Sequence, residues 1–197
     1  MKFFKLVYLL FTPRLSTEEV GKKIVDKATR SAFRVFRDND FRKLVKFSEI
    51  SQTEQDRIFN ELVVNAVVLA VLMTETRANQ IEDSNFSRSV RILSKAIKKR
   101  YPEMLQALGV TNQQHIDMWH QLIDMRIEEY RKYEKDMRND VDEATKHIPW
   151  LPIVITGTVD HIRRGKLKEG DTLFKIISSW LGPLLVGIQK VMFRLER

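Results

Sequence analysis

The chain has 197 residues, of which 43% are hydrophobic and 30% are charged. This length and composition predict one folded domain with a substantial core and exclude an intrinsically disordered protein. There is no cysteine, so disulfides, thiolate metal sites and cysteine nucleophiles are excluded, and the net charge of +8 favours an anionic partner over a cationic one.

The first residues, MKFFKLVYLLFTP, are mostly apolar and carry two lysines. They differ from a secretory signal because the apolar run over residues 6–11 is short, Lys5 interrupts it and no small-residue cleavage site follows. We therefore interpret this segment as part of the mature chain, either an amphipathic membrane anchor or a segment packed on the core. We expect a cytoplasmic protein, with membrane association as the alternative.

The first predicted helix starts at a capping box formed by Ser16 and Glu19 and ends near Arg37, where the sequence Asp-Asn-Asp breaks the pattern. A short helical piece follows it. Cations recur along the first helix at intervals of three and four residues, within about 80° of one another on a helical wheel. This first basic stripe consists of Lys23, Lys27, Arg30, Arg34 and Arg37.

A second capping box, Ser51 with Glu54, opens a helix that ends near Arg77. Within it, thirteen of the sixteen residues over 58–73 are apolar, and they cover every side of a helix. A helix that is apolar all round is buried on all sides. The stretch is shorter than the roughly 18–20 residues that cross a bilayer, so we expect it to be the central helix of a bundle.

Asp83 or Ser84 caps a third helix, which we expect to end near Lys99. It carries a second basic stripe consisting of Arg88, Arg91, Lys95 and Lys99, with Lys98 beside it. Like charges one turn apart destabilise a helix by a few tenths of a kcal/mol per pair, so two single-sign stripes indicate a binding role. The alternative is a solvated face in a basic protein. A third cluster, Arg163, Arg164, Lys166 and Lys168, lies on the turn before the last helix.

Pro102 is expected to start a separate short turn that Gly109 closes. A long helix then begins after Thr111 or Asn112 and extends to about residue 147, where prolines stop it. Arg126 occupies a position in the apolar series of this helix, so we predict that it pairs with Glu61 of the central helix inside the bundle. A buried charge needs a partner because an unpaired one costs several kcal/mol. The alternative is a polar pocket that holds a ligand.

The sequence carries no phosphate-binding loop, nucleophile elbow or zinc-protease motif. On the long helix His120, Asp124 and Glu128 follow one another at intervals of four residues, a spacing that suits a metal if a second helix adds ligands. Arg131 and Lys135 continue the same face, which is more typical of a solvated helix side. We therefore expect no metal site and no cofactor.

The last two helices are expected over residues 152–164 and from Asp171 to the C-terminus, the second interrupted at Gly182 and Pro183. The final helix has one apolar face and cations at its margins. This pattern suits either a helix docked on the bundle or a helix lying in a membrane interface. In the second case the apolar anchor consists of Trp180, Leu181, Leu184 and Ile188.

Taken together, the patterns predict an all-α bundle around residues 58–73, with residues 1–148 forming the bundle and residues 149–197 a C-terminal helical hairpin packed on it as part of one domain. No family signature is recognisable in the residues. We expect a non-enzymatic basic interaction module that binds an anionic membrane surface or an acidic protein. The alternatives are a nucleic-acid-binding protein that uses the same stripes, and a small-molecule enzyme or sensor with its site near Glu61 and Arg126. The oligomeric state is left open.

Overall fold

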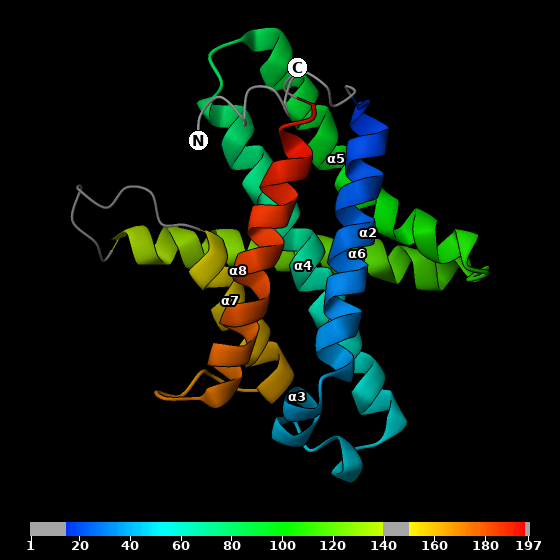
Figure 1. The fold of residues 1–197 in the computed structure, drawn as a ribbon, viewed down its shortest axis with the longest axis vertical. Helices are drawn as coiled ribbons and strands as arrows, with labels where there is room; N and C mark the ends of the chain where they lie inside the picture. The colour runs from blue at the N-terminus through cyan, green and yellow to red at the C-terminus, as the bar shows by residue number, and fades with distance from the viewer. Residues whose placement is uncertain (1–14, 140–149, 196–197) are drawn as a thin grey trace, which may run out of the picture.

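The computed structural model describes residues 15–139 and 150–195 of the chain. Within these residues the regular structure consists of seven α-helices and one 3-10 helix, with no strand, so the predicted all-α class is confirmed. α2 (Thr17–Arg37) and α8 (Thr172–Met192) lie side by side on one face, and α4 (Gln52–Gln80) passes behind them (Figure 1). The other elements are α3 (Asn39–Leu44), η1 (Phe47–Glu49), α5 (Ser84–Ala107), α6 (Gln113–Asn139) and α7 (Trp150–Arg163).

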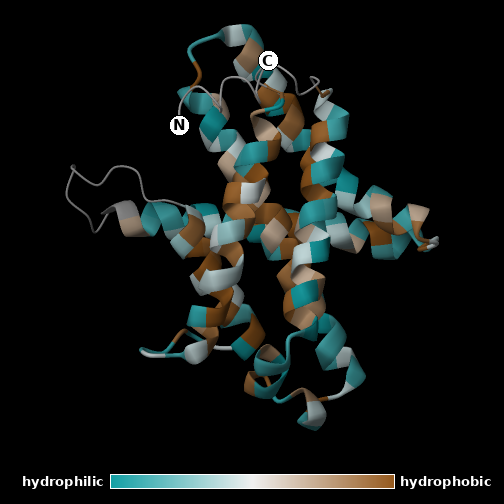
Figure 2. Ribbon diagram, viewed as in Figure 1, coloured by the Kyte–Doolittle hydropathy of each residue, from teal (hydrophilic) through white to brown (hydrophobic). Residues whose placement is uncertain are grey.

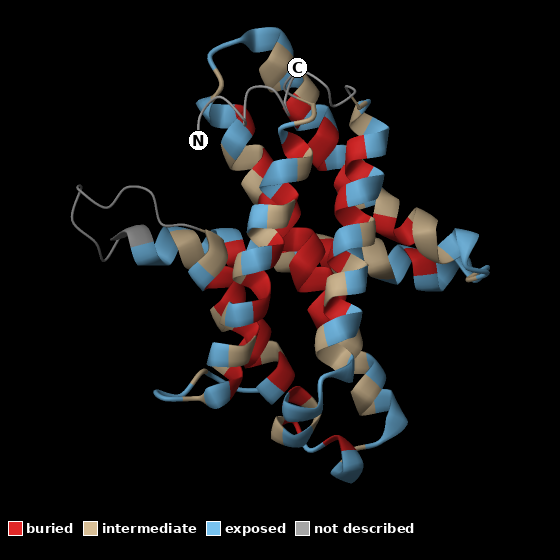
Figure 3. Cartoon of the chain, in the orientation of Figure 1, coloured by how far each residue is buried: buried red, intermediate tan, exposed pale blue. Residues whose placement is uncertain are grey.

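The core is built around α4, which packs against α2, α5, α6, α7 and α8. Every residue from 61 to 72 is buried, as the all-round apolar pattern predicts. Apolar and buried residues lie where the helices face one another, and polar, exposed residues lie on the outer faces and at the ends (Figures 2 and 3). Contact with neighbouring helices on every side therefore explains why α4 is apolar all round.

Two helices, α4 and α8, are long and apolar enough to cross a bilayer by length and composition. In α4, 78% of the most apolar 18-residue window is buried inside the protein, whereas in α8 the share is 33%. Core helices of soluble proteins pass the same test, so this finding is weak support for a membrane protein. It does show that α8 keeps much of its surface outside the core.

The helix starts follow the local capping signals. Ser16 Oγ accepts a hydrogen bond from the Glu19 backbone N–H at 3.2 Å, and Glu19 Oε2 accepts one from the Ser16 N–H at 2.8 Å, which completes the capping box. Ser51 Oγ accepts from the Glu54 N–H at 3.3 Å. The Asp171 carboxylate accepts from the Leu173 N–H at 2.8 Å. These bonds satisfy donors that have no partner within their own helix.

Two prolines do not end helices where the sequence predicted that they would. α5 continues through Pro102 to Ala107 because Tyr101 and Pro102 are buried, with the Tyr101 ring edge-on to Trp119 of α6 at 5.2 Å. α8 continues through Pro183, which lies on its exposed side together with Ser179. The Ser179 carbonyl has no backbone N–H donor at this proline. Buried and partly buried residues before and after each proline in the sequence stabilise the continuous helix by more than the one lost backbone hydrogen bond costs.

The C-terminal helices form a hairpin whose turn is held by side chains. Asp160 Oδ1 accepts a hydrogen bond from the Leu167 N–H at 2.6 Å, and Arg163 pairs with Asp171 at 3.0 Å. α7 packs on α4, and α8 packs on α2 and α7. α7 begins at Trp150, so Pro152 lies in its first turn, where a missing N–H has no cost. The predicted N-terminal apolar segment and the predicted extension of the long helix to residue 147 lie outside the described residues.

Candidate functional site

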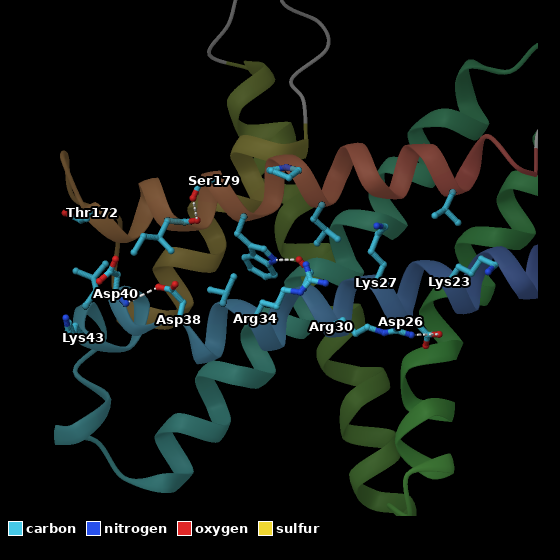
Figure 4. A pocket seen from close by; sticks show the side chains of 18 of the residues that line it. Lys23, Asp26, Lys27, Arg30, Arg34, Asp38, Asp40, Lys43, Thr172 and Ser179 are labelled. Carbon is cyan, nitrogen blue, oxygen red and sulfur yellow. Dashed lines mark hydrogen bonds and ion pairs between the residues drawn. The ribbon is translucent and has the colours of Figure 1, made fainter. Parts of the chain in front are cut away.

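A groove of about 1370 Å³ follows the seam between α2 and α8 and reaches α3 at one end (Figure 4). Six cations and three carboxylates line it, which leaves the groove positively charged. The cations are Lys23, Lys27, Arg30 and Arg34 of α2, Lys43 of α3 and Arg194 just after α8. We call this feature the α2–α8 groove.

The carboxylates of the α2–α8 groove neutralise few of its cations. Asp26 Oδ2 lies 3.9 Å from Nη2 of Arg30, whose side chain is 76% exposed, so this pair is weak. Asp38 is occupied as the cap of α3, since its Oδ1 accepts from two backbone N–H groups at 2.9 and 3.0 Å. Within residues 15–139 and 150–195, no carboxylate oxygen lies within 4.0 Å of the charged groups of Lys27 or Arg34. These cations are therefore free to meet an anionic partner.

The floor of the α2–α8 groove is apolar and ties its two walls together. The Trp180 indole Nε1 of α8 donates a hydrogen bond to Ser31 Oγ of α2 at 2.7 Å. The side chain of Lys27 crosses from α2 to α8, because a Cβ built on Gly187 would lie 2.9 Å from its Cε. A larger residue at position 187 would require the end of the Lys27 side chain to shift. The apolar lining consists of Val35, Leu44, Ile176, Trp180, Pro183, Leu184 and Val191.

The structure brings four of the five cations of the first basic stripe into the α2–α8 groove and leaves Arg37 outside it. The Arg37 guanidinium lies 5.6 Å from the centre of the Phe33 ring, a cation–π contact on the exposed side of α2. None of the cations of the second stripe, on α5, lines the groove. The two stripes therefore do not act at one groove.

Several cations of the second and third clusters already have partners. On α5, Arg91 donates to Asn79 Oδ1 at 2.8 Å, Lys99 pairs with Glu103 at 2.9 Å, and Lys98 pairs with Asp124. In the turn before α8, Arg163 pairs with Asp171, and Arg164 pairs with Glu54 at 2.5 Å. Arg163 and Arg164 thus tie the hairpin to its own cap and to the start of α4. Arg88 and Lys95 remain exposed on α5.

The four residues expected to form an exposed apolar anchor are buried instead. Trp180 is 7% exposed and Leu184 is 4% exposed, and both line the groove floor. Leu181 and Ile188 are fully buried in the core. In this structure the apolar face of α8 packs on α2 and α7, which corresponds to the docked-helix alternative, because that face finds more apolar area inside the bundle than outside it.

Lys43 and Arg194 belong to the site although sequence reasoning did not select them. Lys43 lies on the short α3 and Arg194 just after α8, 151 residues apart in the chain. Neither belongs to a periodic stripe. Only the packing of α3 and α8 against α2 brings these residues to the groove, so no local pattern signals them.

A second polar cluster, which we call the core network, joins α4, α6 and α7. Arg126 Nη2 lies 2.6 Å from Glu61 Oε1 and its Nε 3.2 Å from Oε2, so the structure contains the ion pair expected from the sequence. Arg126 Nη1 also reaches Glu129 at 3.1 Å, and Glu129 lies 3.0 Å from His161 Nε2. Burial raises the pKa of Glu129, but the bond and charge of His161 and the charge of Arg126 outweigh it, so the net pKa is lowered.

The core network is buried at its α4 end, whereas the Glu129 and His161 side chains keep 26% and 18% of their surface exposed. Tyr130 donates to Asn65 Oδ1, and both residues are fully buried, while Glu61 is 6% exposed. Burial raises the pKa of Tyr130 well above its usual range. None of Glu61, Asn65, Arg126 and Tyr130 lines the α2–α8 groove or the smaller cavity of about 450 Å³ beside Tyr133. The geometry is that of a register-fixing network rather than a ligand pocket.

Neither a search for metal ligands among the described residues nor a comparison with known proteins identifies a further functional site. Among the described residues, no group of three or more His, Asp or Glu side chains is placed to hold a metal ion. Of the spaced series on α6, Asp124 pairs with Lys98 of α5. Comparison of the chain with protein-family models, curated proteins and solved structures finds no match.

Proposed function

We propose that this protein is a non-enzymatic basic interaction module that binds an acidic segment of a partner protein in the α2–α8 groove. The observation that carries this proposal is the gathering of six cations along a concave apolar seam. Such cations attract an anionic partner over a Debye length of about 8 Å at physiological ionic strength, which raises the association rate. Contact with the apolar floor supplies affinity that charge alone does not.

The concave shape favours a protein segment over a bilayer. Trp180 and Leu184 lie at the bottom of the groove with 7% and 4% of their surface exposed. A flat membrane surface touches the rims of such a groove and leaves its floor empty, whereas a protruding segment reaches both. The cationic rim and the apolar floor are then used by the same partner.

The groove also suits a protein segment better than a nucleic acid. Proteins that bind single strands stack bases on aromatic side chains. In the described part of the chain, Trp180 is the only aromatic residue in the groove lining, and it is buried and bonded to Ser31. The second basic stripe lies outside the groove, so it does not extend the charged track that a duplex backbone requires.

The proposal is tested with fluorescein-labelled polyglutamate as the probe and fluorescence anisotropy as the readout. The groove variant is Lys27→Glu with Arg34→Glu, two exposed positions without ion-pair partners in the described chain. The control is Arg88→Glu with Lys95→Glu on α5, which changes the net charge by the same amount. We expect the groove variant to lose at least about tenfold in affinity, or about 1.4 kcal/mol, and the control to lose little.

Two outcomes would overturn the proposal. Equal losses in the groove and control variants would mean that the probe responds to overall charge and not to the groove. Tighter binding of phosphatidylserine vesicles or duplex DNA than of polyglutamate, with the same dependence on Lys27 and Arg34, would assign the groove to lipid or nucleic acid. Circular dichroism of each variant checks that it is folded.

A further inference from the structure

The cations on the α2 wall of the groove recur once per helical turn. Lys23, Lys27, Arg30 and Arg34 span twelve residues of α2, and the eleven steps from first to last rise about 16 Å at 1.5 Å per residue. A partner that meets all four must present an anionic group about every 5.4 Å. Acidic residues three or four apart on an α-helix have this spacing, whereas same-side residues of an extended strand are about 6.6 Å apart. The spacing favours a helical occupant over an extended one.

The two walls of the groove differ in chemistry. The α8 wall contributes Thr172 and Ser179, whose side chains are small and neutral, and Pro183. Among the described residues of this wall, Arg194, just beyond the end of α8, is the only cation that lines the groove. An occupant therefore needs carboxylates along the edge that faces α2, small or neutral residues along the edge that faces α8, and an apolar face against the floor. These three requirements together describe an amphipathic helix.

The ends of the groove also differ in charge, as Figure 4 shows. Asp38 and Asp40 lie at the α3 end beside Lys43, whereas Lys23, Lys27 and Arg194 lie toward the other end with Asp26. The N-terminus of a helix carries partial positive charge and its C-terminus partial negative charge. An occupant is thus favoured with its N-terminus near α3, which makes it antiparallel to α2.

We infer that the α2–α8 groove binds an amphipathic α-helix of about three turns from a partner protein, with acidic residues at i, i+4, i+7 and i+11 along one edge and its N-terminus near α3. This inference rests on the proposed function and specifies the partner. It assigns the cations of α2 to the acidic edge, and the partly exposed lining residues Val35, Ile176 and Val191 to the apolar face of the occupant. Recognition then depends on the pattern of charges and not only on their number.

The test compares two 15-residue peptides of identical composition, one with this acidic edge and an apolar leucine face, the other with the same residues scrambled around the helix. Binding is measured by anisotropy and induced helicity by circular dichroism. We expect the patterned peptide to bind at least tenfold more tightly than the scrambled one, to gain helicity on binding, and to lose affinity with Lys27→Glu and Arg34→Glu. Paramagnetic labels on either peptide end report its direction in the groove.

A second variant separates shape from charge. Ser179 is exposed on the α8 wall, so Ser179→Trp obstructs the groove without altering any charge. We expect it to weaken the patterned peptide at least tenfold and to leave polyglutamate binding nearly unchanged. Equal affinity for the two peptides, or no effect of Ser179→Trp, would overturn the helical occupant while the acidic-partner function stands. If neither peptide nor polyglutamate binds, both proposals fail.

Discussion

The ion pair between Arg126 and Glu61 allows a quantitative test of the core. Their side chains are 13% and 8% exposed, and removal of Arg126 leaves Glu61 with only the Asn65 amide at 3.5 Å among the contacts described. An uncompensated buried carboxylate of this kind costs about 3–5 kcal/mol. For a chain of this size each kcal/mol shifts the Tm by about 2–4 °C, so Arg126→Met is expected to lower the Tm by roughly 6–20 °C.

The assay is urea unfolding followed by circular dichroism, with two companion variants. Arg131 lies on the same helix and pairs with Glu75 at 2.6 Å, but the two side chains are 52% and 32% exposed. Arg131→Met is therefore a matched control, with an expected loss of about 1 kcal/mol or less. The double variant Glu61→Met with Arg126→Met removes both charges, and we expect it to recover most of the loss, giving a coupling of at least about 2 kcal/mol.

The reasoning would be refuted by equal losses in Arg126→Met and Arg131→Met. It would also fail if the double variant were as unstable as the sum of the two single variants. Either result would mean that the pair is screened by water in solution and that α4 and α6 are aligned by apolar packing alone.

Two further properties follow from the same helices. Gly157→Ala should destabilise the fold by about 1–3 kcal/mol, because the added Cβ would lie 2.2 Å from Cε1 of the fully buried Tyr130. Gly182→Ala has open space around it and should be neutral or stabilising by up to about 1 kcal/mol. Equal urea unfolding midpoints for the two variants would contradict this reasoning. The pKa of Glu129 is lowered from its usual 4.5, so Glu129 stabilises the fold above about pH 4.5 and loses this contribution as the pH falls through its folded pKa. Glu129→Gln should therefore lose stability at pH 7, and this loss should shrink as the pH is lowered below 4.5 toward the folded pKa. A loss that does not change with pH would show that His161 and its neighbours do not favour the ionised carboxylate.

Features that depend on neighbouring residues in the chain were predictable from the sequence. Ser16 and Ser51 cap the helices that their motifs predict, because the bonds involved span three residues. The all-round apolar stretch of α4 predicts burial without knowledge of its partners. Arg126 was expected to pair with Glu61 because a charge in an apolar series has few ways to be satisfied.

Features that depend on tertiary packing were not predictable. Pro102 and Pro183 were expected to interrupt helices, yet burial on both sides carries α5 and α8 through them. Arg164 was counted as a free cation, although Glu54, 110 residues away, accepts its hydrogen bond. The α2–α8 groove itself exists only because α8 packs beside α2, so a helical wheel of α2 shows its cations but not the apolar floor beside them.

The most direct test of the acidic-partner groove is the response of the three tryptophan indole N–H signals to the patterned acidic peptide in nuclear magnetic resonance. The Trp180 indole lies in the groove floor, whereas the Trp150 indole donates to Thr76 and Trp119 packs on Tyr101, both away from the groove lining. Trp180→Phe assigns the groove signal. We predict that the Trp180 signal shifts in a saturable way while the Trp119 and Trp150 signals stay in place. Shifts at Trp119 or Trp150 with none at Trp180 would contradict the account.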